Sequence, residues 1–207
     1  MSNVTIIGAG GMGTAIAGIA AKGGARVQVL ARDAEKAAAA AAGELSTAGA
    51  VGDAITGDIV VLALPYPAVD EVLAAYEGKL DGKIIVDITN PLDFSTFDSL
   101  VVPADGSAAS EIQARVPGAK VLKAFNTNFA ATLATGEVGG HPVTVLVAGD
   151  DADAKASFAS VVEAGGISVI DAGALKRARE LEALGFLQLT LAAGEKVTWT
   201  GGFAVAK

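Results

Sequence analysis

The sequence predicts an α/β protein built on a Rossmann-type, doubly wound and mostly parallel sheet. Three observations predict this fold class. Short apolar runs alternate with helical stretches along the chain. Residues 59–64 form a continuous apolar run, which is typical of a strand buried on both faces of a parallel sheet. A glycine-rich turn joins the first apolar run to an alanine-rich helix, as in nucleotide-binding proteins.

The first half of the chain contains four expected strands and three expected helices. Apolar runs place the strands at residues 4–7, 26–30, 59–64 and 83–88. The first helix follows the glycine turn, and the next two are expected at residues 34–42 and 69–76. Pro65 and Pro67 end the third strand, because proline cannot continue a central strand.

The second half continues the alternation after a long loop at residues 93–106. Ser107 is expected to cap a helix that runs to residue 116, with Glu111 near its positive end. The remaining elements before the last helix are strands at 121–125, 143–148 and 167–171 and a helix at 152–164.

The last expected helix, residues 174–193, changes character along its length. Its first half carries charges that can pair at i,i+3 and i,i+4 spacing on a solvated face, including Glu180 and Glu182. Residues 184–191 are apolar nearly all round, which indicates burial in the core or against a partner. Because this helix follows a complete sheet, we expect a homodimer contact here.

The glycine-rich turn has the spacing that dinucleotide-binding proteins use. The first glycine of the pattern permits a tight turn, the second lets the backbone approach a pyrophosphate, and the third lets the helix pack on the strand. The helix N-terminus then offers unpaired N–H groups to the phosphates. We therefore expect a dinucleotide to be bound by Gly8, Ala9, Gly10, Gly11, Met12 and Gly13.

The end of the second strand favours NADP over NAD. An acid commonly stands there in NAD-binding proteins, whereas this chain has Ala31 and Arg32. A guanidinium can hold a 2′-phosphate through two parallel charge-assisted hydrogen bonds. Lys36 is expected on the same side of the following helix as Arg32. Asp33, the nearest acid, is interpreted as the N-cap of the helix at 34–42.

Composition excludes several classes of function. The net charge is −8 and no basic cluster is present, which argues against nucleic-acid and anionic-membrane partners. No apolar run approaches the roughly 18 residues of a membrane-spanning helix, and the first residues lack a signal-peptide pattern. With no cysteine and one histidine, we expect no metal site. These features together predict a cytoplasmic protein.

The expected crevice lies outside the carboxyl ends of the strands. Leu64-Pro65, Asn90-Pro91 and Asn126 each follow a strand, so we expect them to meet the glycine turn and Arg32. His141 lies in a turn and Asp87 within a strand, and both are interpreted as structural. We assign no catalytic residue. Hydride transfer directly between two bound cofactors requires only that the protein orient two rings.

The chain resembles the F420H2:NADP oxidoreductase family, the NADPH-dependent reductases of coenzyme F420. The resemblance covers nearly the whole chain, and residues 171–182 (DAGALKRARELE) are its most family-specific part. Its other carriers are residues 8–13, 31–32, 87–92 and 123–127.

The resemblance implies an enzyme that exchanges hydride between C4 of the NADP nicotinamide and C5 of the deazaflavin F420, its co-substrate. It implies a small dimer in which the deazaflavin lies in an apolar crevice against the nicotinamide. Ala9 stands where some family members carry a hydroxyl residue. The residues matched to the family are the glycine turn for pyrophosphate, Arg32 with Lys36 for 2′-phosphate, Leu64 and Pro65 beside nicotinamide, and Asn90 and Asn126 near the rings.

The expected organisation has two parts. Residues 1–150 form the NADP-binding Rossmann domain. Residues 151–207 form an extension that completes the sheet and contributes the dimer contact or the deazaflavin pocket. Two alternatives remain open: reduction of a flavin or a ferric complex with NADPH on the same scaffold, and a non-catalytic module that senses NADP(H).

Overall fold

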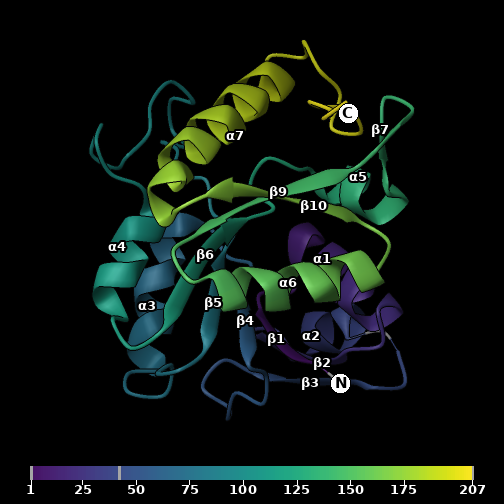
Figure 1. Ribbon diagram of the computed structural model, residues 1–207, viewed down its shortest axis with the longest axis vertical. Helices are drawn as coiled ribbons and strands as arrows, with labels where there is room; N and C mark the ends of the chain where they lie inside the picture. The colour runs from purple at the N-terminus through teal and green to yellow at the C-terminus, as the bar shows by residue number, and fades with distance from the viewer. Residues whose placement is uncertain (1, 42, 207) are drawn as a thin grey trace.

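Eight strands form one sheet in the computed structural model, which describes residues 2–41 and 43–206 (Figure 1). The order across the sheet is β3-β2-β1-β4-β5-β6-β9-β10. Strand β9 pairs antiparallel with β6, and the other neighbours in this sheet pair parallel. The doubly wound, mostly parallel α/β fold predicted from the sequence is therefore confirmed.

The strands of this sheet are short, apolar and mostly central. Their bounds are β1 Asn3–Ile7, β2 Arg26–Ala31, β3 Ser46–Ala50, β4 Ile59–Leu62, β5 Ile84–Asp87, β6 Lys120–Ala124, β9 Thr144–Gly149 and β10 Ser168–Gly173. A separate antiparallel pair consists of β7 Glu137–Val138 and β8 His141–Pro142. His141 is exposed in this hairpin.

Helices cover both faces of the sheet, and the buried side chains form two cores. The α-helices are α1 Gly11–Lys22, α2 Ala34–Ala40, α3 Val69–Ala75, α4 Ala108–Arg115, α5 Ala130–Thr135, α6 Ala152–Ala164 and α7 Ala178–Ala193. One core contains side chains of α1, α2, α5 and α6, and the other contains side chains of α3 and α4. Short 3-10 helices, η1 Tyr66–Ala68 and η2 Leu175–Arg177, precede α3 and α7.

The helix starts confirm the capping expectations. The Asp33 carboxylate accepts hydrogen bonds from the N–H groups of Glu35 and Lys36, and Ser107 forms a reciprocal capping box with Ser110. Helix α6 has the expected bounds. Helix α2 ends at Ala40, and residue 42, the expected end, lies outside the described residues.

Several elements were not predicted from the sequence. Strand β3 reads STAGA, whose small side chains lack the apolar pattern of a buried strand, and it lies at the edge of the sheet. Helix α5 and the β7–β8 hairpin are also additional. Helix α5 packs against α1, so its position is a tertiary rather than a local property.

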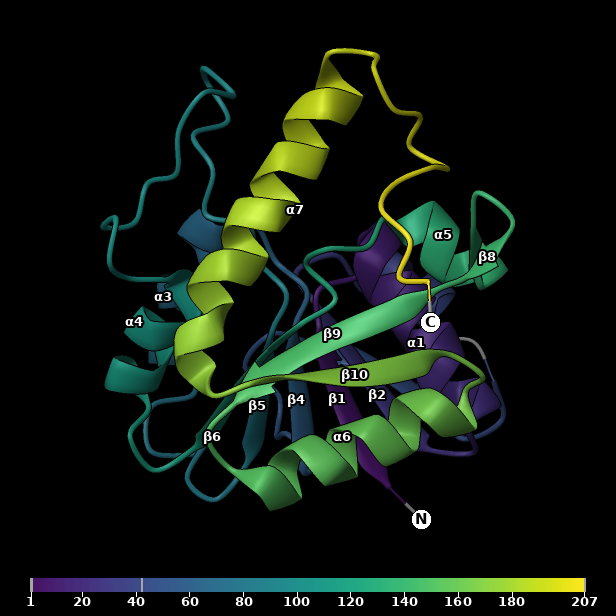
Figure 2. The same cartoon turned by 45° about the horizontal axis from the view of Figure 1, so that its top comes forward.

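The antiparallel strand β9 changes the shape of one end of the molecule. It pairs with β6 only through Val147–Gly149, so residues 144–146 continue past the end of β6. Strand β10 extends alongside β9, and α7 rises beyond the sheet from the end of β10 (Figure 2). Residues after α7 return toward α5. Residues 151–206 therefore add one edge strand, the helix beneath it and a projecting helix.

Substitution of glycine by alanine is expected to have opposite effects on stability at two positions. Gly165 lies where a Cβ would be 2.3 Å from the Ile19 carbonyl oxygen of α1, whereas Gly18, inside α1, has open space. We expect Gly165→Ala to lower the unfolding free energy by at least about 1 kcal/mol, because the packed helices must separate. Gly18→Ala should raise it by up to about 1 kcal/mol through helix propensity. Urea unfolding measures both, and equal effects would contradict this view of the contact between α1 and α6.

Candidate functional site

An open cavity of about 290 Å³ lies beside the glycine turn, where β1, β2 and β4 end. Residues from three loops that are distant in sequence meet there. The predicted residues that line it are Gly8, Ala9, Gly10, Ala31, Arg32, Lys36, Leu64 and Pro65. The remaining lining residues include Asp33, Val51, Ala63 and Glu71. The fold thus brings together most of the residues expected to hold a dinucleotide.

The glycine turn leaves a helix N-terminus open toward this cavity. Gly10 is the N-cap of α1, and no side chain in the described chain accepts hydrogen bonds from the first turn. A Cβ added to Gly10 would meet no protein atom within 4 Å and would extend into the space outside the helix. An uncapped helix end with a bare backbone suits a phosphate group, because it supplies N–H donors and a positive dipole.

The other glycines of the turn serve the backbone. Gly8 has φ +119°, and a Cβ there would be 2.1 Å from the Ala63 carbonyl oxygen. A Cβ added to Gly13 would likewise be 2.1 Å from the Gly8 carbonyl oxygen. Met12 is half-buried against the core, and Gly11 lines a separate groove between α1 and α5. Of the residues expected to hold the pyrophosphate, Gly11, Met12 and Gly13 therefore do not line the cavity.

Positive charge gathers at the end of β2. Arg32 is exposed and forms no ion pair with any residue in the described ranges. Lys36 lies 3.6 Å from an Asp33 carboxylate oxygen, and both side chains are largely exposed. The pKa of Asp33 is lowered chiefly by the hydrogen bond from the Lys36 backbone N–H. Lys36 therefore has the Asp33 carboxylate as its partner, whereas Arg32 has no ion-pair partner among the described residues and remains available to an anionic group.

A hydrogen bond to helix α4 fixes the loop after β4. Tyr66 follows Pro65, and its hydroxyl donates a hydrogen bond to the Glu111 carboxylate of α4. Burial, with a further contribution from Glu111, raises the pKa of Tyr66 above its usual range. The neutral phenol therefore persists at physiological pH and links the Leu64-Pro65 turn to α4.

Asn90, Pro91 and Asn126 do not line the glycine-turn cavity. Asn90 and Asn126 instead hydrogen-bond to each other beneath α7. The Asn126 Nδ2 donates to Asn90 Oδ1 at 3.0 Å and to the Leu181 carbonyl at 2.8 Å. The Asn90 Nδ2 donates to the Asn126 carbonyl at 2.9 Å. We call these two side chains the amide pair. Asn126 Oδ1 and Thr89 Oγ1 are buried with no hydrogen-bond partner in the described chain.

The residue before the amide pair is in a strained conformation. Phe125 has φ +62°, which is rare for a residue with a side chain. Its ring is buried and packs edge-on against Phe158 of α6, with the ring centres 5.4 Å apart. Such strain persists only where packing enforces it, and it is common beside functional groups.

A buried ionic network lies behind the amide pair and was not predicted from the sequence. The Lys123 Nζ is fully buried and lies 2.8 Å from Asp87 Oδ2, 2.8 Å from Glu182 Oε1 and 2.5 Å from the Thr89 carbonyl oxygen. The other carboxylate oxygen, Glu182 Oε2, accepts a hydrogen bond from the Ala108 N–H at the start of α4. The sequence signal was a lysine inside the apolar strand VLKAF, next to a strand that ends in aspartate.

The expectation that Glu182 lies on a solvated face is wrong. Its side chain is 1% exposed, whereas Arg177 and Glu180 form the predicted exposed i,i+3 pair. Burial raises the pKa of Glu182, and Lys123 acts in the opposite direction. A buried carboxylate is tolerated here because a cation and two backbone N–H groups face it.

Other classes of site have no counterpart in the described residues. Among residues 2–41 and 43–206, no group of three or more His, Cys, Asp or Glu side chains could hold a metal ion. Within the same ranges, no helix has both the length and the apolar content required to cross a membrane.

The fold and the cavity define a Rossmann-type protein with a dinucleotide-type glycine turn. Comparisons with known proteins identify one family within this class. Residues 3–91 match the family model described as NADP oxidoreductase coenzyme F420-dependent. The chain is 34% identical over 209 residues to the F420-dependent NADP reductase of Methanothermobacter thermautotrophicus, covering 92% of this chain and 89% of that protein. The chain belongs to the F420-dependent NADP reductase family.

Two further proteins of the same description are also similar to this chain. The F420-dependent NADP reductase of Methanocaldococcus jannaschii is 34% identical over 151 residues, which cover 70% of this chain and 66% of that protein. A solved structure described as a candidate F420-dependent NADP reductase from Arthrobacter sp. FB24 has a TM-score of 0.85 and 31% identity, with both chains fully covered.

The raised pKa of Glu182 predicts a pH-dependent stability difference. Because the folded protein holds this proton more tightly, the unfolding free energy should fall as the pH rises from about 4.5, the ordinary value, to the folded pKa. Glu182→Gln removes this titration. The stability of the wild type minus that of Glu182→Gln should therefore decrease across this window and then level off. Urea unfolding from pH 4 to 8 measures it, and a difference that increases with pH would contradict the burial effect.

Proposed function

We propose that this protein transfers a hydride between NADP(H) and the deazaflavin coenzyme F420. The observation that carries the proposal is the cavity in which an uncapped helix N-terminus and the unpaired Arg32 face the same space. The named relatives supply the acceptor, since F420 is part of their description. NADP(H) is maintained in the cytoplasm, so we place the protein there.

The residues divide the dinucleotide between them. The bare backbone at Gly10 and the start of α1 would receive the pyrophosphate. Arg32 would pair with the 2′-phosphate, assisted by Lys36 at the rim. Leu64 and Pro65 line the same cavity and would flank the nicotinamide side. The amide pair would lie toward the rings.

The proposed chemistry requires orientation rather than acid–base catalysis by the chain. When both coenzymes are bound, a hydride passes from C4 of the dihydronicotinamide to C5 of the deazaflavin, and a solvent proton completes the reduced deazaflavin. Asp87 and Glu182 are buried and each is paired with the buried Lys123, and none of the three lines the glycine-turn cavity. The cavity residues would align the nicotinamide, and the amide pair with α7 would align the deazaflavin, which supplies proximity and orientation.

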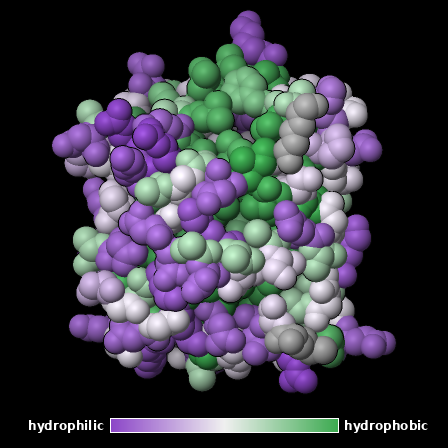
Figure 3. Space-filling view, viewed as in Figure 1, coloured by the Kyte–Doolittle hydropathy of each residue, from purple (hydrophilic) through white to green (hydrophobic). Residues whose placement is uncertain are grey.

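We propose that residues 151–207 provide the deazaflavin wall and a homodimer contact. Helix α7 buries polar side chains, Glu182 and Gln188, toward the sheet. Leu181 is buried beside them, whereas the apolar side chains at 184, 186, 189 and 191 are half-buried and Leu187 is 50% exposed. Trp199, Phe203 and Val205 add exposed apolar area. In Figure 3 apolar residues gather at the upper end of this face, where α7 and the residues after it lie in Figure 1.

The function is tested by mixing the purified protein with NADPH and oxidised F420. We expect the deazaflavin absorbance to bleach at a rate proportional to enzyme concentration, while NADPH is consumed in equal amounts. Free flavin and ferric citrate serve as alternative acceptors. Turnover with these and not with F420 would replace the proposal with a flavin or ferric reductase. Tight NADPH binding without turnover on any acceptor would indicate a sensing module.

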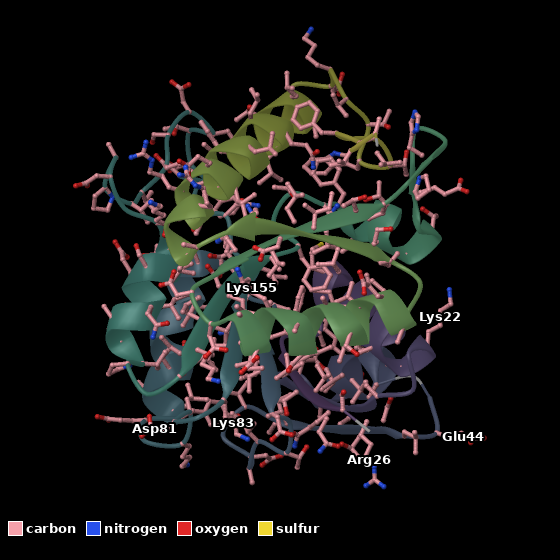
Figure 4. The ribbon with its side chains drawn as sticks, viewed as in Figure 1. Lys22, Arg26, Glu44, Asp81, Lys83 and Lys155 are labelled. Atoms are coloured by element: carbon pink, nitrogen blue, oxygen red, sulfur yellow. The ribbon has the colours of Figure 1, made fainter. Side chains whose placement is uncertain are left out.

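Arg32→Ala should weaken NADPH far more than NADH. Loss of charge-assisted hydrogen bonds to the 2′-phosphate is worth about 1.5–3 kcal/mol, so the Kd for NADPH should rise by about 10–100-fold. The Kd for NADH, which lacks this phosphate, should change by less than about twofold. Arg26, at the opposite end of β2 and pointing into solvent in Figure 4, is the control. Equal weakening of both dinucleotides would exclude Arg32 as the discriminating residue.

The dimer is tested by placing a charge on each of two exposed leucines. Leu187 on α7 and Leu45 before β3 are 50% and 46% exposed. We expect the wild type and Leu45→Glu to sediment as dimers and Leu187→Glu as a monomer, because a charge cannot be buried unpaired in an apolar contact. A monomeric wild type at micromolar concentration, or a dimeric Leu187→Glu, would overturn the proposed contact.

A further inference from the structure

The network of Lys123, Asp87 and Glu182 is the buried charged cluster that the proposed hydride transfer does not use. Its three charged members come from three different elements, β6, β5 and α7. The Lys123 ammonium has three N–H donors and three close oxygen partners, so its bonding capacity is filled. The network is therefore a closed connection between the sheet and α7.

Each charge lies within three residues of a member of the amide pair or of its contacts on α7. Asp87 precedes Asn90 on one segment, and Lys123 precedes Asn126 on the next. Glu182 stands directly after Leu181, whose carbonyl accepts from Asn126. The same three segments therefore carry both the ionic network and the amide pair. Any shift of α7 that breaks one set of bonds also disturbs the other.

Helix α7 packs so closely on the amide pair that no side chain can be accommodated at the contact. Gly185 is buried at this contact, and a Cβ there would lie 2.3 Å from Asn90 Oδ1 and 2.8 Å from the Asn126 carbonyl oxygen. One turn further on, Gln188 Nε2 donates to the Thr127 carbonyl at 3.2 Å. Leu181 is buried on α7 as well, whereas the apolar residues at 184, 186, 187, 189 and 191 are half-buried or exposed.

An ion pair in a dry interior fixes position more sharply than apolar packing does. Leaving one charge of such a pair buried without its partner is strongly unfavourable, so displaced placements of α7 are disfavoured. The Glu182 carboxylate also accepts from the Ala108 and Ala109 N–H groups, at 3.0 and 3.4 Å. Helix α7 is thereby located against α4 and the sheet at once.

We propose that Glu182, through Lys123, is a positioning residue for the transfer reaction: the pair holds α7 at the depth at which Gly185 contacts the Asn90–Asn126 amide pair, and so sets the wall of the crevice for the second ring. This inference rests on the proposed function. It assigns to the ionic network control over ring alignment, with NADPH binding in the glycine-turn cavity left independent of it.

The test compares Glu182→Leu with two other variants. Glu182→Leu leaves the Lys123–Asp87 pair balanced in charge and removes the bond to α7. Gly185→Ala displaces α7 at the amide pair without touching any charge. Glu180→Gln, on the exposed side of the same helix, is the matched control. For each folded variant we measure the Kd for NADPH, the kcat with F420, and hydrogen exchange of residues 181–188.

In Glu182→Leu and Gly185→Ala, we expect kcat to fall at least tenfold and the exchange rate of residues 181–188 to rise at least tenfold. The Kd for NADPH should stay within twofold, and 4-deuterated NADPH should give a larger isotope effect as hydride transfer becomes limiting. Glu182→Gln should recover part of kcat, and Glu180→Gln should match the wild type. Unchanged kcat and exchange in folded Glu182→Leu would overturn the proposal. If that variant does not fold, Gly185→Ala and Glu182→Gln decide.

The two proposals fail in different ways. If the wild type does not reduce F420, the proposed function is wrong. Hydrogen exchange still decides whether Glu182 fixes α7, because that measurement needs no acceptor. If the wild type is active and Glu182→Leu only lowers the melting temperature, the network is purely stabilising and the positioning role is excluded.

Discussion

The burial of the Lys123 ammonium is the constraint on which this structure depends. An ammonium group in a dry interior must be paired and hydrogen-bonded, because its transfer from water is otherwise prohibitively costly. Here the partners come from β5, from α7 and from the backbone beyond β5. Satisfying one cation therefore dictates where the last helix meets the sheet. The carboxyl end of the sheet, where ligands bind in doubly wound folds, acquires its lateral wall as a result.

Helix α7 is unusual in burying polar side chains together with apolar ones. Its half-buried and exposed positions carry four leucines and a phenylalanine, and its buried residues are Ala178, Leu181, Glu182, Gly185, Gln188 and Ala192. Apolar packing normally holds a surface helix in place, with polar residues facing water. In this protein directional polar bonds add to that packing, and the apolar side chains within residues 184–191 remain available for other contacts. The same helix can therefore serve the crevice on one side and the proposed partner subunit on the other.

Local signals in the sequence were sufficient for much of the fold. The Asp33 and Ser107 caps and the glycine turn each have a short-range physical cause, and the structure contains all of them. The apolar run at residues 59–64 also forms a strand, which ends two residues early, at Leu62. Strand β3 was missed because its pairing with β2, rather than its small side chains, makes it a strand. The reversed direction of β9 likewise follows from pairing with β6 and has no local signature.

The site shows the same division. The cavity at the glycine turn was predictable because its residues follow strand ends that the fold class brings together. Glu182 was misplaced because it lies in a run of charged residues, and nothing within that run indicates which acid faces inward. The informative residue was Lys123, a charge inside an apolar strand, whose partners come from β5 and from a helix much later in the chain.

The long sequence separation between Lys123 and Glu182 has a consequence for the order of folding. Contacts between residues far apart along a chain are entropically costly to close, so they form late unless strong local structure brings them together. Lys123 and Asp87 lie on the neighbouring strands β6 and β5, so they can pair when the sheet assembles. The Glu182 carboxylate reaches Lys123 and the start of α4 only when α7 docks. We expect the final, cooperative stage of folding to be the closure of this ionic network, so that a functional crevice forms only when the chain is fully folded.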